Sequence, residues 1–310
     1  MIEVRGLTKR YGETVAVDKL SFTVPSGVVT GFLGPNGAGK STTMRMIAGL
    51  DAPSAGSVRV NGQRYRRTAA PMAELGILLE ARAVHTSRSA FYHLLALAQS
   101  NGIARGRVDE VIDLVGLRSV AKQRAGAFSL GMGQRLGIAA ALLGDPQTVV
   151  LDEPVNGLDP EGIRWVRELL QNLAAAGRTV FISSHLMSEM ALTATRLIVI
   201  GRGRLIADTT VQEFVARASG RTVLVRTPDE GVLTALLCGP AVRVHTVEPG
   251  RLRIEGLSAE EVGDLAWRNN IRVHELTVQQ ASLEEAFMEL TAGAVQYQAG
   301  SIQPNGLSTA

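Results

Sequence analysis

One short stretch constrains the fold of this chain more than any other. It is Gly34-Pro35-Asn36-Gly37-Ala38-Gly39-Lys40-Ser41-Thr42, and it satisfies the pattern G-x-x-x-x-G-K-[ST]. The apolar run 28–33 before it predicts a buried strand, and the segment 41–50 after it predicts a helix. Backbone N–H groups of such a loop and helix start surround phosphate oxygens. The sequence therefore predicts a phosphate-binding loop, in which Lys40 reaches the terminal phosphates and Ser41 offers its hydroxyl to Mg²⁺.

Composition and charge narrow the class of protein. The 310 residues carry a formal net charge of +3, and the longest basic cluster is Arg64-Tyr65-Arg66-Arg67, so no nucleic-acid partner is expected. The single cysteine, Cys238, excludes an internal disulfide and fits a reducing compartment. The first residues lack the apolar region of a signal peptide, and no apolar run is long enough to span a bilayer. We therefore expect a cytoplasmic, soluble chain that reaches a membrane only through a partner.

The order of expected elements predicts an α/β fold. Strands are expected at 2–7, 15–17, 20–24, 57–60, 75–79, 148–151, 179–183, 197–200 and 204–207, with residues 8–12 as a turn. Helices are expected at 88–100, 106–115, 133–143 and 161–176. A start rich in strands, followed by alternating strands and helices, predicts a mainly parallel core with an antiparallel appendage.

A second domain is expected after about Arg217, where the pattern changes. Strands at 221–226, 241–247, 251–254 and 271–276 and helices at 230–237, 259–268 and 283–290 indicate a small α+β domain. The end of the chain is rich in glycine, glutamine and serine and is expected to be disordered. The expected division is thus 1–217, 218–292 and a tail at 293–310.

Two adjacent carboxylates end the apolar strand Thr148-Val149-Val150-Leu151. At a strand end beside the phosphate loop, Asp152 would bind Mg²⁺ directly or through water. Glu153, one residue further on, could polarise a water molecule for in-line attack on the γ-phosphorus. The alternative is an ordinary boundary between a strand and a loop.

Three further motifs make a family resemblance specific. They are Phe128-Ser129-Leu130-Gly131-Met132-Gly133-Gln134-Arg135, then Asn156-Gly157-Leu158-Asp159-Pro160, then Ser183-Ser184-His185. In this order after the phosphate loop, they resemble the signature, D-loop and switch histidine of ATP-binding cassette (ABC) ATPases. The resemblance covers residues 1 to 215, and the Ser-Leu-Gly-Met form resembles cassettes that serve ABC-2-type exporters.

The resemblance implies a P-loop ABC ATPase fold with an antiparallel β subdomain and a helical subdomain. It also implies that Ser129 and Gly131 cap the γ-phosphate of an ATP held by a second copy of the chain. Asp159 would belong to the same nucleotide interface, His185 would sense the γ-phosphate, and Tyr11 would stack on adenine. The alternatives are that Ser129 merely caps a helix and that Tyr11 is a core aromatic.

The chain departs from the family pattern at two places. Glu80 stands where the family usually has a glutamine whose side-chain oxygen meets Mg²⁺; a carboxylate can still ligate the metal, with extra charge near the phosphates. Leu130 and Met132 replace a glycine and a glutamine of the commoner signature.

These motifs predict an ATP-hydrolysing subunit that uses ATP and Mg²⁺ and forms a head-to-tail sandwich dimer. It would power export of a drug or antibiotic through a separate ABC-2-type permease, attached to the inner face of the membrane. The segment 282–291 resembles the end of the small domain that follows such cassettes, which bears on dimer stability or permease pairing.

Two other classes stay open at this point. A soluble ABC ATPase acting on ribosomes would carry two cassettes, and one acting on DNA would carry a coiled-coil insertion, which residues 40–150 lack. A metabolic P-loop kinase would lack the signature and D-loop. The cargo and the transport direction are not encoded in these motifs.

Overall fold

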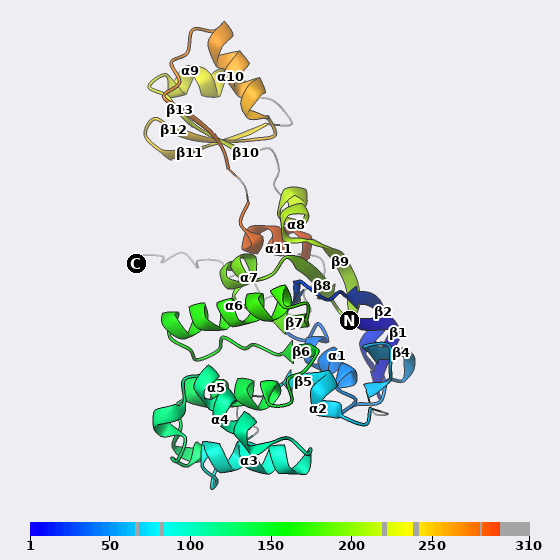
Figure 1. Cartoon of the computed structure of the whole chain (residues 1–310). Coiled ribbons are helices and arrows are strands. Elements are labelled where there is room, and N and C mark those ends of the chain that lie inside the picture. The colour runs from blue at the N-terminus through cyan, green and yellow to red at the C-terminus, as the bar shows by residue number, and fades with distance from the viewer. Residues whose placement is uncertain (66–67, 81–83, 219–221, 238–241, 280, 292–310) are drawn as a thin grey trace, which may run out of the picture. The chain divides into compact units, whose positions relative to one another are not determined.

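The computed structural model describes residues 1–65, 68–80, 84–218, 222–237, 242–279 and 281–291 (Figure 1). Contacts among these residues group into two compact units. One comprises Met1–His185 with Ile198–Asp208, and the other comprises Leu186–Leu197 with Thr209–Leu290. A unit defined by contacts is not necessarily a domain that folds on its own, so the expected domain boundary at 217/218 stays a prediction. The expected tail at 293–310 lies outside the described residues.

The first unit begins with an antiparallel sheet in the order β2-β1-β4, made of β1 (Ile2–Tyr11), β2 (Thr14–Val24) and β4 (Ala55–Val60). The expected turn at 8–12 is wrong, because β1 continues to Tyr11. The two strands expected at 15–17 and 20–24 are a single strand. Lys19 forms a bulge in that strand: its φ is 49°, and its N–H donates to Thr8 Oγ1 at 3.1 Å. The strand pairs with β1 both before and after this bulge.

A six-stranded sheet forms the centre of the fold in the order β5-β6-β7-β3-β8-β9. Its strands are β3 (Val29–Leu33), β5 (Leu75–Leu78), β6 (Thr148–Leu151), β7 (Thr179–Ser183), β8 (Arg196–Gly201) and β9 (Arg204–Thr210). β5, β6, β7 and β3 pair in parallel, which confirms the expected α/β architecture. Because parallel strands end at one edge, the segments that follow these four strands meet there.

Three phenylalanines link the two sheets. Phe22 of β2, Phe32 of β3 and Phe181 of β7 lie with ring centroids 5.0–5.8 Å apart. They belong to one buried core together with residues of α1 (Lys40–Ile47). This core fixes the strand that leads into the phosphate loop against the strand that leads to His185.

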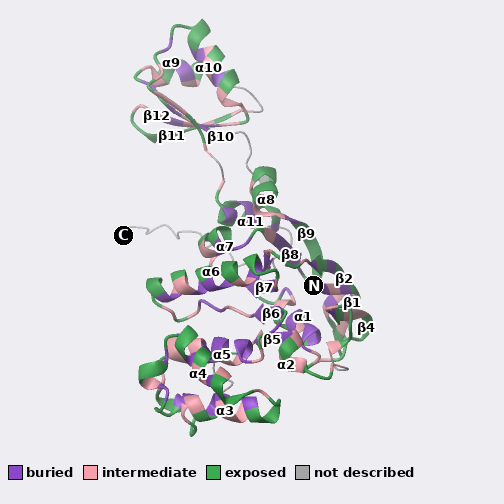
Figure 2. Cartoon of the chain, in the orientation of Figure 1, coloured by how far each residue is buried: buried purple, intermediate pink, exposed green. Residues whose placement is uncertain are grey.

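Three helices pack together as a helical part of the same unit: α3 (Ala90–Ser100), α4 (Arg105–Leu114) and α5 (Leu130–Leu142). α5 was expected to begin at Gly133, but it begins three residues earlier because the Ser129 side chain accepts a hydrogen bond from Met132 N. It also packs against β5 and β6, and most of its residues are buried (Figure 2). α5 therefore connects the helical part to the central sheet.

Other α-helices belong neither to the helical part nor to the C-terminal arrangement described below. They are α2 (Pro71–Glu74), α6 (Pro160–Ala175), α7 (Met187–Thr193), α8 (Val211–Ala218) and α11 (Leu283–Thr291). α7 and α8 were not expected from the sequence. Among the described residues, none of the helices combines the length and the apolar character needed to cross a bilayer.

The second unit contains a β-α-β-β-α-β arrangement. Its elements are β10 (Thr222–Arg226), α9 (Glu230–Leu237), β11 (Arg243–Glu248), β12 (Arg251–Glu255), α10 (Ala259–Arg268) and β13 (Glu275–Val278). The sheet order β11-β12-β10-β13 is antiparallel throughout, which is the ferredoxin-like arrangement. The strand expected at 271–276 is wrong in its limits, because only residues from Glu275 onward pair with β10.

Candidate functional site

The phosphate loop joins β3 to α1, as expected. Its last glycine, Gly39, has a φ of 100° and lies so close to β2 that a Cβ there would be 2.6 Å from Ala16 O. Gly39 is also the N-cap of α1, and no side chain caps that helix start. The first N–H groups of α1 are therefore left to bind a ligand, and an anion suits them.

A cavity of about 370 Å³ lies over this loop. It is lined by Pro35 to Thr42 of the loop, by Ala16 of β2, and by Asp152 and Glu153. The structure thus brings the two strand-end carboxylates to the phosphate loop, as the sequence predicted. Gly34 is not among the lining residues, but its carbonyl accepts a hydrogen bond from the Lys40 ammonium.

Lys40 is folded onto the loop. Its Nζ donates to Gly34 O and, at 3.3 Å, to Pro35 O. Burial lowers the pKa of Lys40, and the carboxylates of Glu153 and Asp152 offset part of that effect. The loop carbonyls hold the cation at the cavity where the phosphates would lie.

The hydroxyl of Ser41 and the carboxylate of Asp152 are neighbours. Ser41 Oγ donates to Asp152 Oδ2 at 2.9 Å, and Ser183 Oγ donates to the other carboxylate oxygen. Two adjacent hard oxygens fit Mg²⁺, which takes few protein ligands and completes its shell with water and phosphate oxygens. The described residues contain no cluster of three or more His, Cys, Asp or Glu that could hold a metal ion.

Both the backbone and the side chain of Glu153 are fixed by hydrogen bonds. Its φ of 52° is left-handed, which is rare for a residue with a side chain. Its N–H donates to Ser183 Oγ at 3.0 Å, and its carbonyl accepts from Gln134 Nε2 at 3.1 Å. Its carboxylate accepts from the backbone N–H of His185 at 3.1 Å and lies 2.7 Å from His185 Nδ1. The sequence predicted Glu153 and His185, but it gave no role to Gln134 or to the Ser183 hydroxyl.

The signature and D-loop residues lie away from this cavity in the same chain. Ser129 caps α5, accepting from Met132 N at 3.2 Å, and Asp159 caps α6, accepting from Gly162 N at 2.9 Å. The lining of the phosphate cavity includes neither of them. The two motifs pack on each other, because a Cβ on Gly131 would lie 2.8 Å from Gly157 O.

Tyr11 ends β1 with its ring 50% exposed, so it is not a core aromatic. Its hydroxyl donates to Asp51 Oδ2 at 3.1 Å, and Arg45 Nε donates to the same oxygen at 2.9 Å. The Lys9 ammonium lies 4.9 Å from the ring centroid. Desolvation and the Asp51 contact raise the pKa of Tyr11, and the Arg45 contact lowers that of Asp51.

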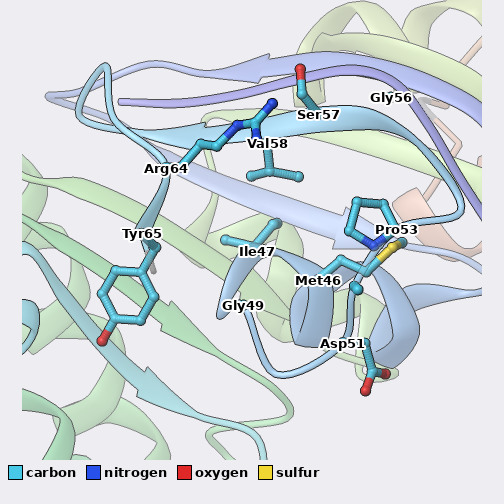
Figure 3. Close-up of a pocket in the computed structure, with 11 residues that line it drawn as sticks. Met46, Ile47, Gly49, Asp51, Pro53, Gly56, Ser57, Val58, Arg64 and Tyr65 are labelled. Atoms are coloured by element: carbon cyan, nitrogen blue, oxygen red, sulfur yellow. The ribbon is translucent and has the colours of Figure 1, made fainter. Parts of the chain in front are cut away.

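A second cavity, of about 400 Å³, lies at the other end of α1 (Figure 3). Its walls are Met46, Ile47, Gly49, Asp51, Ala52, Pro53, Gly56, Ser57, Val58, Arg64 and Tyr65. Burial raises the pKa of Tyr65. It is the larger of the two cavities but contains no residue of the phosphate loop, so volume alone does not identify the nucleotide site.

Glu80 is exposed, two residues after the end of β5. The phosphate cavity is not lined by it. The expected role of Glu80 as a metal ligand therefore stays a prediction.

Known proteins resemble the chain along nearly its whole length. Residues 17–156 match the ABC transporter family. An uncharacterized ABC transporter ATP-binding protein of Bacillus subtilis, YhcH, is 36% identical over 295 residues, which is 94% of this chain and 96% of that protein. The chain belongs to the ABC transporter ATP-binding proteins. It is the ATP-binding subunit of such a transporter and an ATPase.

Two more comparisons extend this result. The bacitracin transport ATP-binding protein BcrA of Enterococcus faecalis is 34% identical over 301 residues, covering 94% of this chain and 97% of that protein. A solved ATP-binding subunit of an ABC transporter superposes with a TM-score of 0.65 at 25% identity, over 70% of this chain and 92% of that one. Residues 221–284 match a domain of unknown function.

Proposed function

We propose that the cassette hydrolyses ATP with Mg²⁺ at the phosphate cavity and thereby drives export of an antibiotic or drug-like compound through an ABC-2-type permease. ATP binding, ATP hydrolysis and action together with a membrane partner follow from membership of the family. The metal, the roles of single residues, the permease class and the cargo are the parts that are proposed. A soluble ABC ATPase acting on ribosomes or DNA is less well supported, because the full-length relatives are transporter subunits.

Lys40 and the loop N–H groups would hold the β- and γ-phosphates. Ser41 and Asp152 would supply oxygen ligands to Mg²⁺, which neutralises charge on the transferred phosphoryl group when bound. The 2.9 Å hydrogen bond between these two side chains supports the assignment, since it brings both oxygens to one point of the cavity. Glu80 would add a further oxygen ligand.

Glu153 would act as the general base. Its carboxylate takes a proton from a water molecule as the water oxygen attacks the γ-phosphorus in line. The bond from that phosphorus to the β-phosphate oxygen breaks, and ADP and inorganic phosphate leave. His185 would orient the carboxylate and sense the γ-phosphate, and Tyr11 would stack on adenine.

A second copy would complete each site. Ser129 and Gly131 start a helix, which suits an anion, and they lie outside the phosphate cavity of their own chain. In a head-to-tail dimer they would cap the γ-phosphate held by the other copy, with Asp159 at the same interface. Such a dimer would explain why the residues expected to bind nucleotide occur on two separate surfaces of one chain.

The exporter proposal is carried by one observation, the full-length similarity to the bacitracin transport subunit BcrA. That similarity extends beyond the cassette into the C-terminal unit. The cassette would act on the cytoplasmic face of the membrane, where ATP is available.

The test is to express the chain with the membrane protein encoded beside it in a bacitracin-sensitive host. We expect the chain to move to the membrane fraction and the inhibitory concentration of bacitracin, or of another peptide antibiotic in a panel, to rise. The Lys40→Ala variant should remain at the membrane without protecting the cells. An active pair that protects against no antibiotic would contradict export, and co-sedimentation with ribosomes would favour the soluble alternative.

A further inference from the structure

We propose that Gln134 is a positioning residue for Glu153. The inference rests on the proposed role of Glu153 as general base. Gln134 lies on α5, one turn into the helix that the signature begins, and nothing in the sequence pattern had given it a function.

The contact between these residues is a partly buried hydrogen bond. The Gln134 side chain is only 2% exposed, and its Nε2 donates to Glu153 O at 3.1 Å. The same carbonyl also accepts from the backbone N–H of Asn156 at 3.2 Å, so Gln134 supplies a second donor, from another element, and ties the peptide that follows Glu153 to α5.

Glu153 needs such a constraint because of its backbone. A φ of 52° is seldom adopted by residues with a side chain and persists only where the surroundings enforce it. Ser183 holds the N–H of Glu153 and Gln134 holds its carbonyl, so the backbone is fixed from β7 on one side and α5 on the other. This backbone directs the Glu153 carboxylate to the phosphate cavity that it lines.

Ser183 is a poorer probe of this arrangement than Gln134. Its hydroxyl also donates to Asp152, so its removal would disturb the expected metal ligand as well. Gln134 hydrogen-bonds to the backbone of Glu153 and is not among the residues that line the phosphate cavity. Its effect on turnover can therefore be separated from effects on nucleotide binding.

The position of Gln134 on α5 gives the contact a further consequence. Gly131 precedes it by three residues, so both lie on the same face of the helix. At Gly131 this face packs against the D-loop at Gly157, and at Gln134 it packs against Glu153. The helix α5 therefore connects two places. One is the signature surface, which is expected to meet the nucleotide of the partner, and the other is Glu153, the proposed general base of the same chain.

The experiment uses the full chain with Gln134→Met, which keeps the length of the side chain and removes the donor. We expect kcat to fall by about 10- to 100-fold, as for a small misplacement of a catalytic group. The dissociation constant for ATP should stay within about twofold, because the loop is unchanged. Gln134→Glu, which sets an acceptor against the carbonyl, should show the same pattern and guards against a folding defect in one variant.

The deciding measurement repeats Gln134→Met in a Glu153→Gln background. Without a basic carboxylate there is nothing left to position, so we expect little further loss of turnover. Ile138→Val is the matched control, since Ile138 is 1% exposed on the same helix and its apolar side chain cannot donate a hydrogen bond to Glu153. It should lower the melting temperature without lowering kcat.

Three outcomes would overturn the proposal. The first is wild-type turnover in both Gln134 variants. The second is an equal loss in the wild-type and Glu153→Gln backgrounds, which would make Gln134 purely structural. The third, wild-type turnover in Glu153→Gln itself, would remove the general base and with it the reason for positioning it. Each outcome appears in a different variant, so a failure of Gln134 is distinguishable from a failure of Glu153.

Discussion

The carboxylate of Glu153 and the ring of His185 are in direct contact, with 2.7 Å between Oε2 and Nδ1. If Glu153 is to act as a base its carboxylate must be ionised, and an ionised carboxylate can only accept, so His185 Nδ1 would be the donor of this hydrogen bond. The backbone N–H of His185 donates to the same oxygen. His185 thus contacts the carboxylate expected to activate water through both its backbone and its ring. It follows β7 closely, at the edge of the sheet where the phosphate loop lies.

The first prediction concerns the ring of His185. His185→Ala keeps the backbone donor to Glu153 but removes the side-chain donor and the proposed γ-phosphate sensor. We expect kcat to fall by about 10²-fold with ATP affinity within about twofold of wild type. Steady-state hydrolysis and equilibrium binding of ATP measure the two quantities. His185→Gln, which retains a donor, should recover part of the rate; if the alanine variant keeps full turnover, His185 has no part in hydrolysis.

The second prediction concerns Lys40, whose ammonium the loop carbonyls hold at the phosphate cavity. Lys40→Ala removes that cation, so tight ATP binding or turnover should be lost. Lys122→Ala is the control, because Lys122 is exposed and outside the cavity lining. Both variants are compared by calorimetric titration with ATP and by phosphate release. Near-normal hydrolysis in Lys40→Ala would refute the assignment of the site.

The third prediction concerns Glu80. If its carboxylate ligates Mg²⁺ in the closed site, Glu80→Gln keeps an oxygen ligand and removes a negative charge near the phosphates. ATP binding should survive, while the Mg²⁺ concentration for half-maximal turnover and the maximal rate should change. A titration of ATPase activity with Mg²⁺ tests this. An unchanged curve would mean that Glu80 is a loop residue without a metal role.

Contiguous motifs account for the parts of the site that the sequence predicted. The phosphate loop and the pair Asp152 and Glu153 are each encoded within a few neighbouring residues, and each is tied to a strand end. Since parallel strands end at one edge, recognising the strands was enough to bring these segments together. The hydrogen bond from Ser41 to Asp152 joins residues 111 positions apart and is of this kind.

Contacts made through space account for what the sequence missed. The Lys19 bulge depends on a hydrogen bond to Thr8 in the neighbouring strand, and it turned two expected strands into one. The anchors of Glu153 at Gln134 and Ser183 involve its backbone, which leaves no trace in residue type. The start of α5 expected at Gly133 was wrong because its first turn contains two glycines, which disfavour a helix, and the cap at Ser129 starts the helix before them.

The fourth prediction concerns the ring of Tyr11. Its hydroxyl is tied to Asp51 and the Lys9 ammonium approaches the ring within 4.9 Å of its centroid, so adenine would stack on the exposed ring surface. Asp51→Ala and Tyr11→Phe each remove the hydrogen bond that holds the ring. Each should weaken ATP binding by about two- to tenfold, the usual effect of losing one hydrogen bond. The affinity for inorganic triphosphate should not change.

The matched comparison for this prediction is the double variant. If the two residues act through one hydrogen bond, Asp51→Ala combined with Tyr11→Phe should weaken ATP binding no more than either change alone. Tyr11→Ala should weaken it further, because the ring itself is lost. Equal affinities for ATP in the wild type and Tyr11→Ala would rule out adenine stacking.

The last prediction concerns Glu153 and the dimer. Glu153→Gln keeps the shape of the side chain and removes most of its basicity, and general-base assistance is typically worth about 10²–10⁴-fold. ATP should then persist long enough for two chains to close on it, so the variant with ATP and Mg²⁺ should elute as a dimer in size-exclusion chromatography. With ADP it should remain a monomer, because no γ-phosphate is left for Ser129 to cap.

Two further changes in the Glu153→Gln background test the role of Ser129. Adding Ser129→Trp should leave monomers with ATP, whereas adding Ser89→Ala, which removes a comparable N-cap from α3, should still allow the dimer. A slow Glu153→Gln variant that stays monomeric with ATP would count against the head-to-tail sandwich, or would require the permease to assemble it.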